Sequence, residues 1–144
     1  MQDGECPKLV DSLSAPMVGE NLRIVMLSMK LRNSHLRNLP KSANFSFEEK
    51  LVCMLNPIIL PEQHSGSSWQ YECNFLEGKK CKELTLVNRV DFVSVDFYSL
   101  SGNKHHIILP FRESRLLQYH MRILDGKDPM ISDGAIPEGL PAKI

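Results

Sequence analysis

The chain has 144 residues, of which 42% are hydrophobic and 24% are charged. This length suits one domain with one core, and the composition excludes the low-hydrophobicity, high-charge class of disordered chains. Seventeen basic residues balance seventeen acidic ones, so the formal net charge is zero. A neutral chain excludes a global field that would attract nucleic acid or an anionic membrane, so any such binding has to be local.

The beginning of the chain, MQDGECPKLVDSL, has an acidic flank and no apolar run of signal-peptide length. No segment approaches the roughly 20 apolar residues that a membrane span requires. The four cysteines are unevenly spaced, unlike those of a secreted disulfide scaffold, and we expect them to be free thiols. The sequence therefore predicts an intracellular protein, cytoplasmic or nuclear, that is not secreted and has no transmembrane segment.

Residues 1–20 contain two prolines and two glycines with little periodicity, and we expect a flexible N-terminal arm. In residues 25–31, Val, Leu, Met and Leu alternate with Met, Ser and Lys. This two-residue period predicts the first strand, with one face buried. The following stretch, LRNSHLRNLPKSAN, has neither a helical nor a strand period and is expected to form a loop.

The stretch SFEEKLVCML predicts a short helix from Ser46 to about Leu55. Ser46 would be the N-cap, with Glu49 three residues later, and the two acids fall in the first turn, where the helix dipole favours negative charge. Two prolines follow and would close the helix. The segment Leu51–Leu55 is equally compatible with a buried strand.

An antiparallel hairpin is predicted from Trp69 onward. Large apolar residues alternate with polar ones, the stretch EGKKCK turns the chain, and ELTLV returns. We expect the loop at residues 78–81, because this register pairs apolar with apolar residues and one acid with one base. The expected partners are Glu77 with Lys82, Phe75 with Leu84 and Cys73 with Leu86.

A second hairpin is predicted in VDFVSVDFYSLSGNKHHIILPF. A three-residue loop, Ser101–Asn103, gives a continuous apolar face that a two-residue Gly102-Asn103 turn would lose, and Asn103 would take the left-handed position. The expected partners are Phe97 with Ile107, Val95 with Leu109 and Val93 with Phe111.

The two histidines of this hairpin, His105 and His106, are adjacent in a strand and should point to opposite faces. We expect His105 on the core side facing Ser99, and His106 on the other face beside Tyr98. They should therefore not share one metal ion or one substrate.

The stretch FRESRLLQYHMRILDGKDP predicts an amphipathic C-terminal helix that ends near Gly126. Its expected apolar stripe consists of Leu116, Leu117, His120, Ile123 and Leu124, with Arg115 and Arg122 outside it. The last residues are rich in proline and glycine and are expected to form an extended tail.

Together these elements predict an α+β fold, a small antiparallel sheet built from hairpins with the C-terminal amphipathic helix packed on it. A pleckstrin-homology-like barrel and a two-layer sandwich are both compatible with this pattern, and neither carries a function. The expected organisation is an arm over residues 1–20, a single domain over 21–126 and a tail over 127–144.

No nucleophile elbow, phosphate-binding glycine loop or paired-carboxylate motif is present in the sequence, and no catalytic residue, metal site or cofactor is predicted. The best set of zinc ligands would be His64, Cys73, Cys81 and Cys53, but the sequence has no CxxC or HxxxH pair. Cys81 lies among lysines, which favour a thiolate, so an enzyme that uses Cys81 or a histidine is the last of three functional hypotheses.

The first hypothesis is a non-catalytic interaction module, an adaptor or subunit of a larger complex with an unidentified protein partner. Apolar residues in both terminal segments would order on that partner; they are Leu9, Leu13, Ile131, Ile136 and Leu140. The second is a domain that binds an anionic ligand, either nucleic acid or phosphoinositide, through basic loops. Its candidate residues are Arg32, Arg37, Lys41, Lys79, Lys80 and Lys82.

Overall fold

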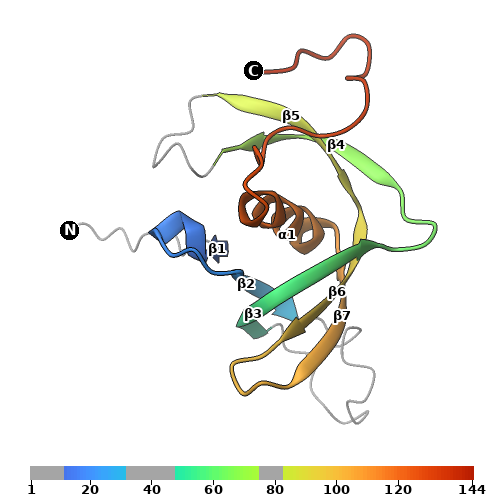
Figure 1. The fold of residues 1–144 in the computed structure, drawn as a ribbon. Helices are drawn as coiled ribbons and strands as arrows, with labels where there is room; N and C mark the ends of the chain where they lie inside the picture. The colour runs from blue at the N-terminus through green and yellow to red at the C-terminus, as the bar shows by residue number, and fades with distance from the viewer. Residues whose placement is uncertain (1–11, 32–47, 75–82) are drawn as a thin grey trace.

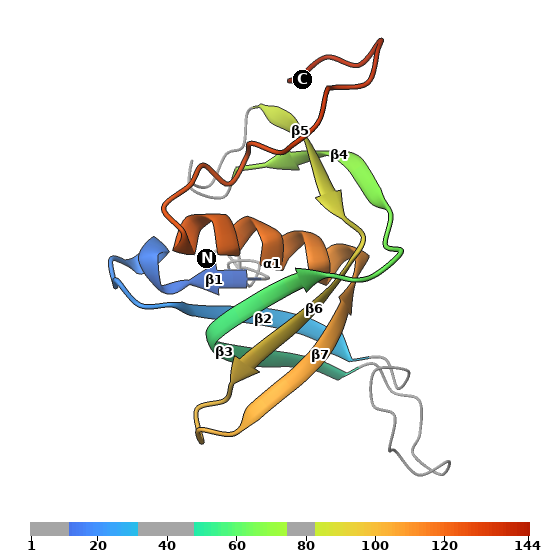
Figure 2. The ribbon, with the colours of Figure 1, turned by 45° about the vertical axis from the view of Figure 1, so that its right-hand side comes forward.

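The computed structural model describes residues 12–31, 48–74 and 83–144 (Figure 1). The chain forms β1 (Ser12–Ser14), the 3-10 helix η1 (Ala15–Val18), β2 (Ile24–Leu31), β3 (Glu48–Pro61), β4 (Ser67–Cys73), β5 (Leu84–Val90), β6 (Phe92–Tyr98), β7 (Lys104–Pro110) and α1 (Phe111–Leu124). The helix lies in the space between two groups of strands, with β4 and β5 on one side and the remaining strands on the other (Figures 1 and 2).

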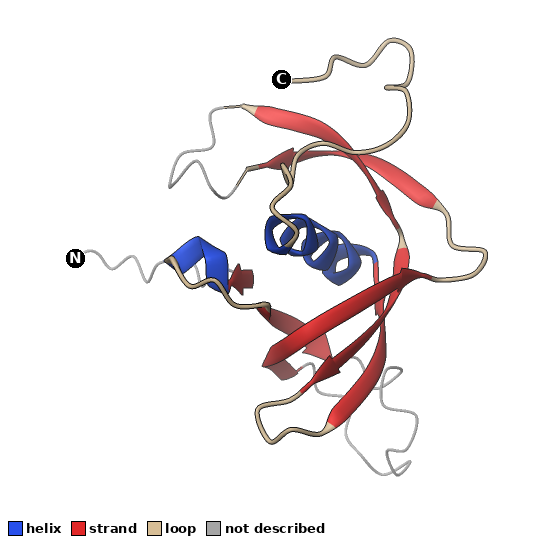
Figure 3. Ribbon diagram, viewed as in Figure 1, coloured by secondary structure: helices blue, strands red, loops and turns tan. Residues whose placement is uncertain are grey.

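The described strands form a five-stranded sheet in the order β1-β2-β3-β6-β7 and a two-stranded sheet of β4 and β5, with antiparallel pairing throughout. Figure 3 shows α1 as the one long helix among the described residues, enclosed by strands. This arrangement confirms an α+β fold with antiparallel sheet and a C-terminal helix. It does not confirm the pleckstrin-homology-like or two-layer alternatives.

The first strand is confirmed as β2, with Val25, Leu27 and Met29 buried. The helix expected from Ser46 is wrong, because residues 48–61 form β3, the longest strand described. The capping pattern is overridden because β3 pairs with β2 on one side and with β6 on the other. Pro57 does not end the strand, since a register shift between Leu55 and Ile58 accommodates it.

Both hairpins exist, but each is displaced by two residues from the expected register. Cys73 pairs with Leu84 instead of Leu86, and the connection between β4 and β5 lies largely outside the described residues. Phe97 pairs with His105 instead of Ile107. A displacement of two residues keeps every side chain on its expected face, so the apolar pattern is satisfied by both registers.

The turn between β6 and β7 explains the second displacement. Ser99 N donates to Asn103 O at 2.9 Å, and Gly102 N donates to Ser99 O at 2.9 Å, so the three-residue loop is Leu100–Gly102, one position earlier than expected. Gly102, with φ of 87°, takes the left-handed position that we had assigned to Asn103.

The histidines of β7 do lie on opposite faces, as expected. The ring of His105 stacks on Phe97 with centroids 5.4 Å apart, whereas His106 Nδ1 lies 2.5 Å from Asp96 Oδ1. In the observed register His105 pairs with Phe97 instead of Ser99. His106 pairs with Asp96, so its neighbour is not Tyr98 as expected.

Helix α1 is confirmed, but it is buried on more than one side. Leu117 and Met121 join the core of the five-stranded sheet, and His120 is fully buried. Arg115, which we expected outside the apolar stripe, is only 8% exposed because it faces the second sheet. A helix between two sheets has no fully solvated face, so a single apolar stripe does not describe it.

Asp91 is the corner at which the chain leaves β5 and enters β6. Its backbone N donates to Gly66 O at 2.9 Å, its carbonyl accepts from Phe111 N at 2.6 Å, and its carboxylate accepts from Ser68 Oγ at 2.6 Å. This residue therefore ties both sheets to the start of α1.

We expect Asp91→Ala to lower the free energy of unfolding by about 1–2 kcal/mol, because the part-buried Ser68 hydroxyl loses a charged acceptor. Urea denaturation measures the change. The matched variant Asp96→Ala removes an exposed carboxylate, 41% accessible, and should cost less than about 1 kcal/mol. If both variants lowered the free energy of unfolding equally, the proposed stabilising role of Asp91 would be contradicted.

The terminal segments are partly ordered by the sheets. Leu13 pairs with Met26 in the five-stranded sheet, and residues 142–144 bond to β5, where Ile144 N donates to Leu84 O at 2.9 Å. The division into arm, domain and tail stays a prediction. No helix of the described residues has the length and apolar character needed to cross a membrane.

Candidate functional site

A cavity of about 240 Å³ lies between β4 and α1. The strand contributes Gln70, Glu72 and Cys73, and the helix contributes Arg112, Arg115, Leu116 and Tyr119. Residues 112, 115, 116 and 119 share one side of α1 because they are separated by three or four positions. The cavity therefore combines an apolar surface with fixed charges.

The charges beside this cavity form a buried network centred on Glu72. Arg89 Nη2 lies 2.9 Å from Glu72 Oε1, and Arg115 Nη2 lies 2.5 Å from Glu72 Oε2. The two arginine side chains are 2% and 9% exposed. Burial lowers the pKa of Arg115, and the Glu72 carboxylate opposes that shift. One carboxylate thus compensates two buried cations.

Arg115 is held by further hydrogen bonds that fix its position. Its Nη1 donates to Ser68 O at 2.8 Å and its Nη2 donates to Val87 O at 2.9 Å. The guanidinium therefore spans the space between α1 and both strands of the small sheet. Such a group presents a cation of defined orientation to the cavity.

Tyr119 and His120 lie beside this charged network. Tyr119 Oη donates to Asn74 Oδ1 at 2.9 Å, and the Arg89 guanidinium lies 5.8 Å from the Tyr119 ring centroid. His120 meets that ring edge-on at 5.1 Å, and neither of its ring nitrogens has a hydrogen-bond partner within the described ranges. Burial, with a smaller effect of the Arg89 charge, lowers the pKa of His120 to about 4.

The described residues do not form a metal centre. A helix that holds zinc commonly supplies two histidines four residues apart, whereas the positions four residues from His120 are Leu116 and Leu124. No group of three or more His, Cys, Asp or Glu suited to a metal lies within residues 12–31, 48–74 and 83–144. We therefore derive no step through a metal ion.

The structure does not bring together those candidate zinc ligands that fall within its described residues. Cys53 is a free cysteine on β3, and His64 lies in the connection between β3 and β4. Cys73 is disulfide-bonded, so our expectation of free thiols is wrong for this residue. Cys81 lies outside the described residues.

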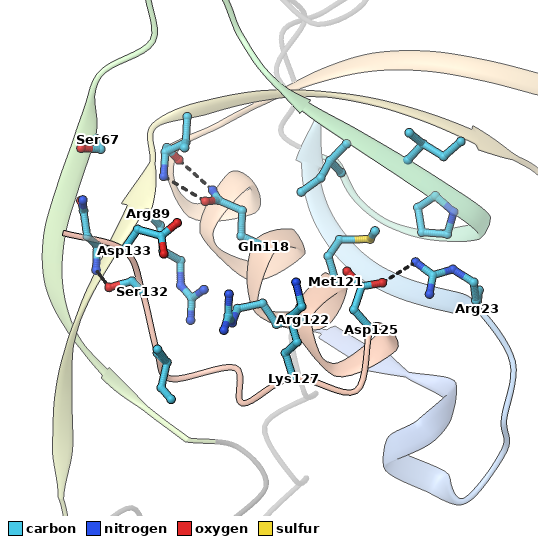
Figure 4. A pocket seen from close by; sticks show the side chains of 16 residues that line it. Arg23, Ser67, Arg89, Gln118, Met121, Arg122, Asp125, Lys127, Ser132 and Asp133 are labelled. Atoms are coloured by element: carbon cyan, nitrogen blue, oxygen red, sulfur yellow. Dashed lines mark hydrogen bonds and ion pairs between the residues drawn. The ribbon is translucent and has the colours of Figure 1, made fainter.

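A second, larger cavity of about 470 Å³ lies beside α1 and shares no lining residue with the first (Figure 4). Its walls come from β3, β5, α1 and the segment after the helix. Gln118 anchors one wall, because its Oε1 accepts from Val90 N at 2.9 Å and its Nε2 donates to Val90 O at 2.8 Å.

The predicted binding residues lie elsewhere. Leu13 is in β1, Ile131 lines the larger cavity, and Ile136 and Leu140 are exposed at 44% and 45%. The residues that fall outside the described ranges are Leu9, Arg32, Arg37, Lys41, Lys79, Lys80 and Lys82. The roles assigned to all these residues stay untested.

Sequence reasoning missed the network of Glu72, Arg89 and Arg115. One signal was available: in LTLVNRV, Arg89 occupies the same strand face as Val87, which is fully buried. A cation on a buried face requires a buried carboxylate. The position of that carboxylate could not be read from the sequence, because Glu72 lies on another strand.

A family model described as polypeptide deformylase matches residues 5–131. No curated protein sequence matches the chain. The fold is similar to that of a class I type b peptide deformylase from Acinetobacter baumannii solved with Met-Ala-Ser bound, with TM-score 0.58, 23% identity and coverage of 82% of this chain and 67% of that chain.

Two further structures show the same fold. A peptide deformylase from Ehrlichia chaffeensis has TM-score 0.61 and 19% identity, covering 82% of this chain and 62% of that chain. A probable peptide deformylase from synechococcus phage S-SSM7 has TM-score 0.59 and 19% identity, covering 82% and 68%. The chain thus spans about two thirds of the length of these proteins.

The comparisons overturn the functional hypotheses ranked first and second above. The family match shows that a non-catalytic adaptor or complex subunit, an anionic-ligand binding domain, and a chain without enzymatic activity were wrong expectations. The expectation of a protein partner is likewise wrong, because the family is named for an activity on polypeptides. The pattern of hairpins and one helix did not reveal this, since fold elements alone carry no function. The match covers most of the chain, and the chain belongs to the polypeptide deformylase family.

Proposed function

We propose that this chain removes the formyl group from the amino terminus of a peptide in the cavity between β4 and α1. Water adds to the formyl carbon, the bond from carbon to nitrogen breaks, and the proton goes to the amine, giving formate and a free amino terminus. The observation that carries the proposal is the family match over residues 5–131, a range that contains every residue lining this cavity.

The cavity suits the end of a peptide. Its volume of about 240 Å³ is small, so it admits one side chain with the formyl group and excludes a folded protein. Leu116 and the Tyr119 ring offer apolar contact for that side chain. The outer edge of β4 has no strand partner within the described residues, so an extended peptide can add to it through main-chain hydrogen bonds.

In this proposal, Arg115 stabilises the negative charge that develops during hydrolysis. Hydrolysis of an amide places negative charge on the former carbonyl oxygen, and a fixed cation nearby stabilises it without having to reorient. Arg115 lines the cavity and is held by Glu72, Ser68 and Val87. Cys73, being disulfide-bonded, has no thiolate to offer as a nucleophile.

The expected location follows the proposed activity. Formylated peptide ends arise where translation begins with a formylated amino acid, so an intracellular location remains part of the proposal. The comparisons give the nuclear alternative no support. The proposed partner is a peptide substrate in place of a protein complex.

Formate release from N-formyl-Met-Ala-Ser tests the proposal, with N-acetyl-Met-Ala-Ser as the substrate control. We expect Leu116→Trp, which fills the cavity, to lower kcat/KM about tenfold or more. The control Leu100→Trp makes the same substitution at a position that is 79% exposed in the turn between β6 and β7 and lines neither cavity, and it should leave kcat/KM unchanged.

The assay is run with a chelator and with added Zn²⁺, because the described residues group no metal ligands. Absence of formate under every condition would refute the proposed activity. Formate release that Leu116→Trp leaves unchanged would refute the placement of the site.

A further inference from the structure

The larger cavity beside α1 contains positive charge that its own walls do not neutralise. Two of its four cations are paired, since Arg23 Nη2 lies 3.0 Å from Asp125 Oδ1 and Arg89 Nη2 lies 2.9 Å from Glu72 Oε1. Figure 4 shows Arg89, Arg122 and Lys127 directed into the cavity from three segments of the chain.

Arg122 and Lys127 are the cations without a carboxylate partner in the described structure. Arg122 Nε donates to the backbone carbonyl of Asp128 at 2.7 Å, which orients the side chain but leaves its charge uncompensated. Asp133 is the remaining acid of the lining. Two cations against one carboxylate leave an excess of one positive charge in a concave site, where low-dielectric walls strengthen its field.

Neutral groups of the same cavity are placed to bind a polar molecule. Ser132 Oγ accepts from Asn88 N at 2.9 Å, and its own proton remains available to a ligand oxygen. Asn88 Oδ1 is buried and has no hydrogen-bond partner within the described residues, so it can accept from a ligand hydroxyl or amine. Met121 and Ile131 add apolar surface.

We propose that this cavity binds a small organic oxyanion, a phosphate ester or a carboxylic acid that also carries a hydroxyl or amine. Arg122 and Lys127 hold the oxyanion, because guanidinium and ammonium groups pair with phosphate and carboxylate oxygens. Ser132 and Asn88 bind the neutral polar part. The cavity volume of about 470 Å³ lies in the range of small-molecule sites and exceeds the needs of an inorganic ion.

The proposed ligand is distinct from the formylated peptide. The two cavities share no lining residue, so either proposal can fail without the other. A duplex nucleic acid or a membrane surface is too large to reach Asn88 and Ser132 inside the cavity. The site is therefore a small-molecule site in addition to the proposed enzymatic one.

Isothermal titration at constant ionic strength with glycerol 3-phosphate, glycerate and glycerol tests this proposal. We expect saturable binding of at least one anion and none of glycerol. Preference for glycerol 3-phosphate would assign a phosphate ester, and preference for glycerate a carboxylic acid. Absence of saturation by both anions up to roughly 10 mM, or equal binding of glycerol, would overturn the proposal.

Variants locate the site. The combination of Arg122→Gln and Lys127→Met should weaken anion binding at least tenfold, because each change removes one charged contact. Lys104→Met removes an exposed lysine on β7, away from the cavity, and should leave the affinity unchanged. Circular dichroism shows that the variants are folded. Unchanged affinity in the folded double variant would exclude this cavity as the binding site.

Discussion

Glu72→Gln is expected to lower the free energy of unfolding by about 3 kcal/mol. The change keeps the shape of the side chain but leaves Arg89 and Arg115 buried without their common anion. Breaking a buried pair by removal of one partner costs about 3–5 kcal/mol, and the lower end applies because the Glu72 side chain is 18% exposed. For a domain of ordinary stability, this loss is a large part of the total free energy of unfolding.

Urea denaturation at pH 7 measures this loss. The matched variant Asp125→Asn breaks the pair with Arg23, in which both side chains are 43% exposed, and should cost less than about 1 kcal/mol. In a double-mutant cycle, Arg115→Gln should cost less in the Glu72→Gln background than in the original chain. Additive costs would show that the two side chains do not interact as the structure places them.

The free energy of unfolding is expected to fall with pH because of the protonation of His120. Its pKa is about 4 in the folded chain and about 6.5 when unfolded. The unfolded state therefore binds the proton first as the pH falls, and the stability present above pH 6.5 is lost toward pH 4. The loss from this one group reaches about 2 kcal/mol at pH 5 and about 3 kcal/mol at pH 4.

The variant His120→Met isolates this effect, because carboxylates titrate in both chains and cancel in the difference. Free energies of unfolding from urea titrations at pH 7, 6, 5 and 4 should diverge progressively in favour of the variant. At pH 7 the variant should already be equal or more stable, since both ring nitrogens of His120 are buried without a partner in the described structure. Parallel pH profiles would mean that His120 is protonated as readily in the folded chain as in water.

The elements of this fold were predictable where a local pattern is unambiguous. The alternation in β2 and the amphipathic stretch of α1 were both recognised, because a hydrophobic period of two or 3.6 residues depends only on residues that are close in sequence. The prediction for β3 failed because the stretch SFEEKLVCML is compatible both with the beginning of a helix and with a strand. Pairing with β2 and β6 decided between them, and neither partner is adjacent in sequence.

The candidate site was not predictable, because its parts come from different elements. Arg115 was noticed as a residue of the helix, but its partner Glu72 lies on β4, and Arg89, which shares that carboxylate, lies on β5. The register of both hairpins was missed by two residues for a related reason. A displacement of two preserves every side-chain face, so hydrophobic pattern cannot detect it.

Local sequence patterns were sufficient to predict the antiparallel hairpins, the C-terminal helix and, for the strands that were recognised, which side chains share a face; the length and neutral charge are read directly from the sequence. These properties follow from composition and from contacts between near neighbours. Three features became visible only in the folded chain: α1 lies between two sheets, Arg115 is buried, and the Glu72 carboxylate pairs with two arginines. The physical reason is that burying a charge depends on a partner brought close by folding, and the distance along the chain does not encode that proximity.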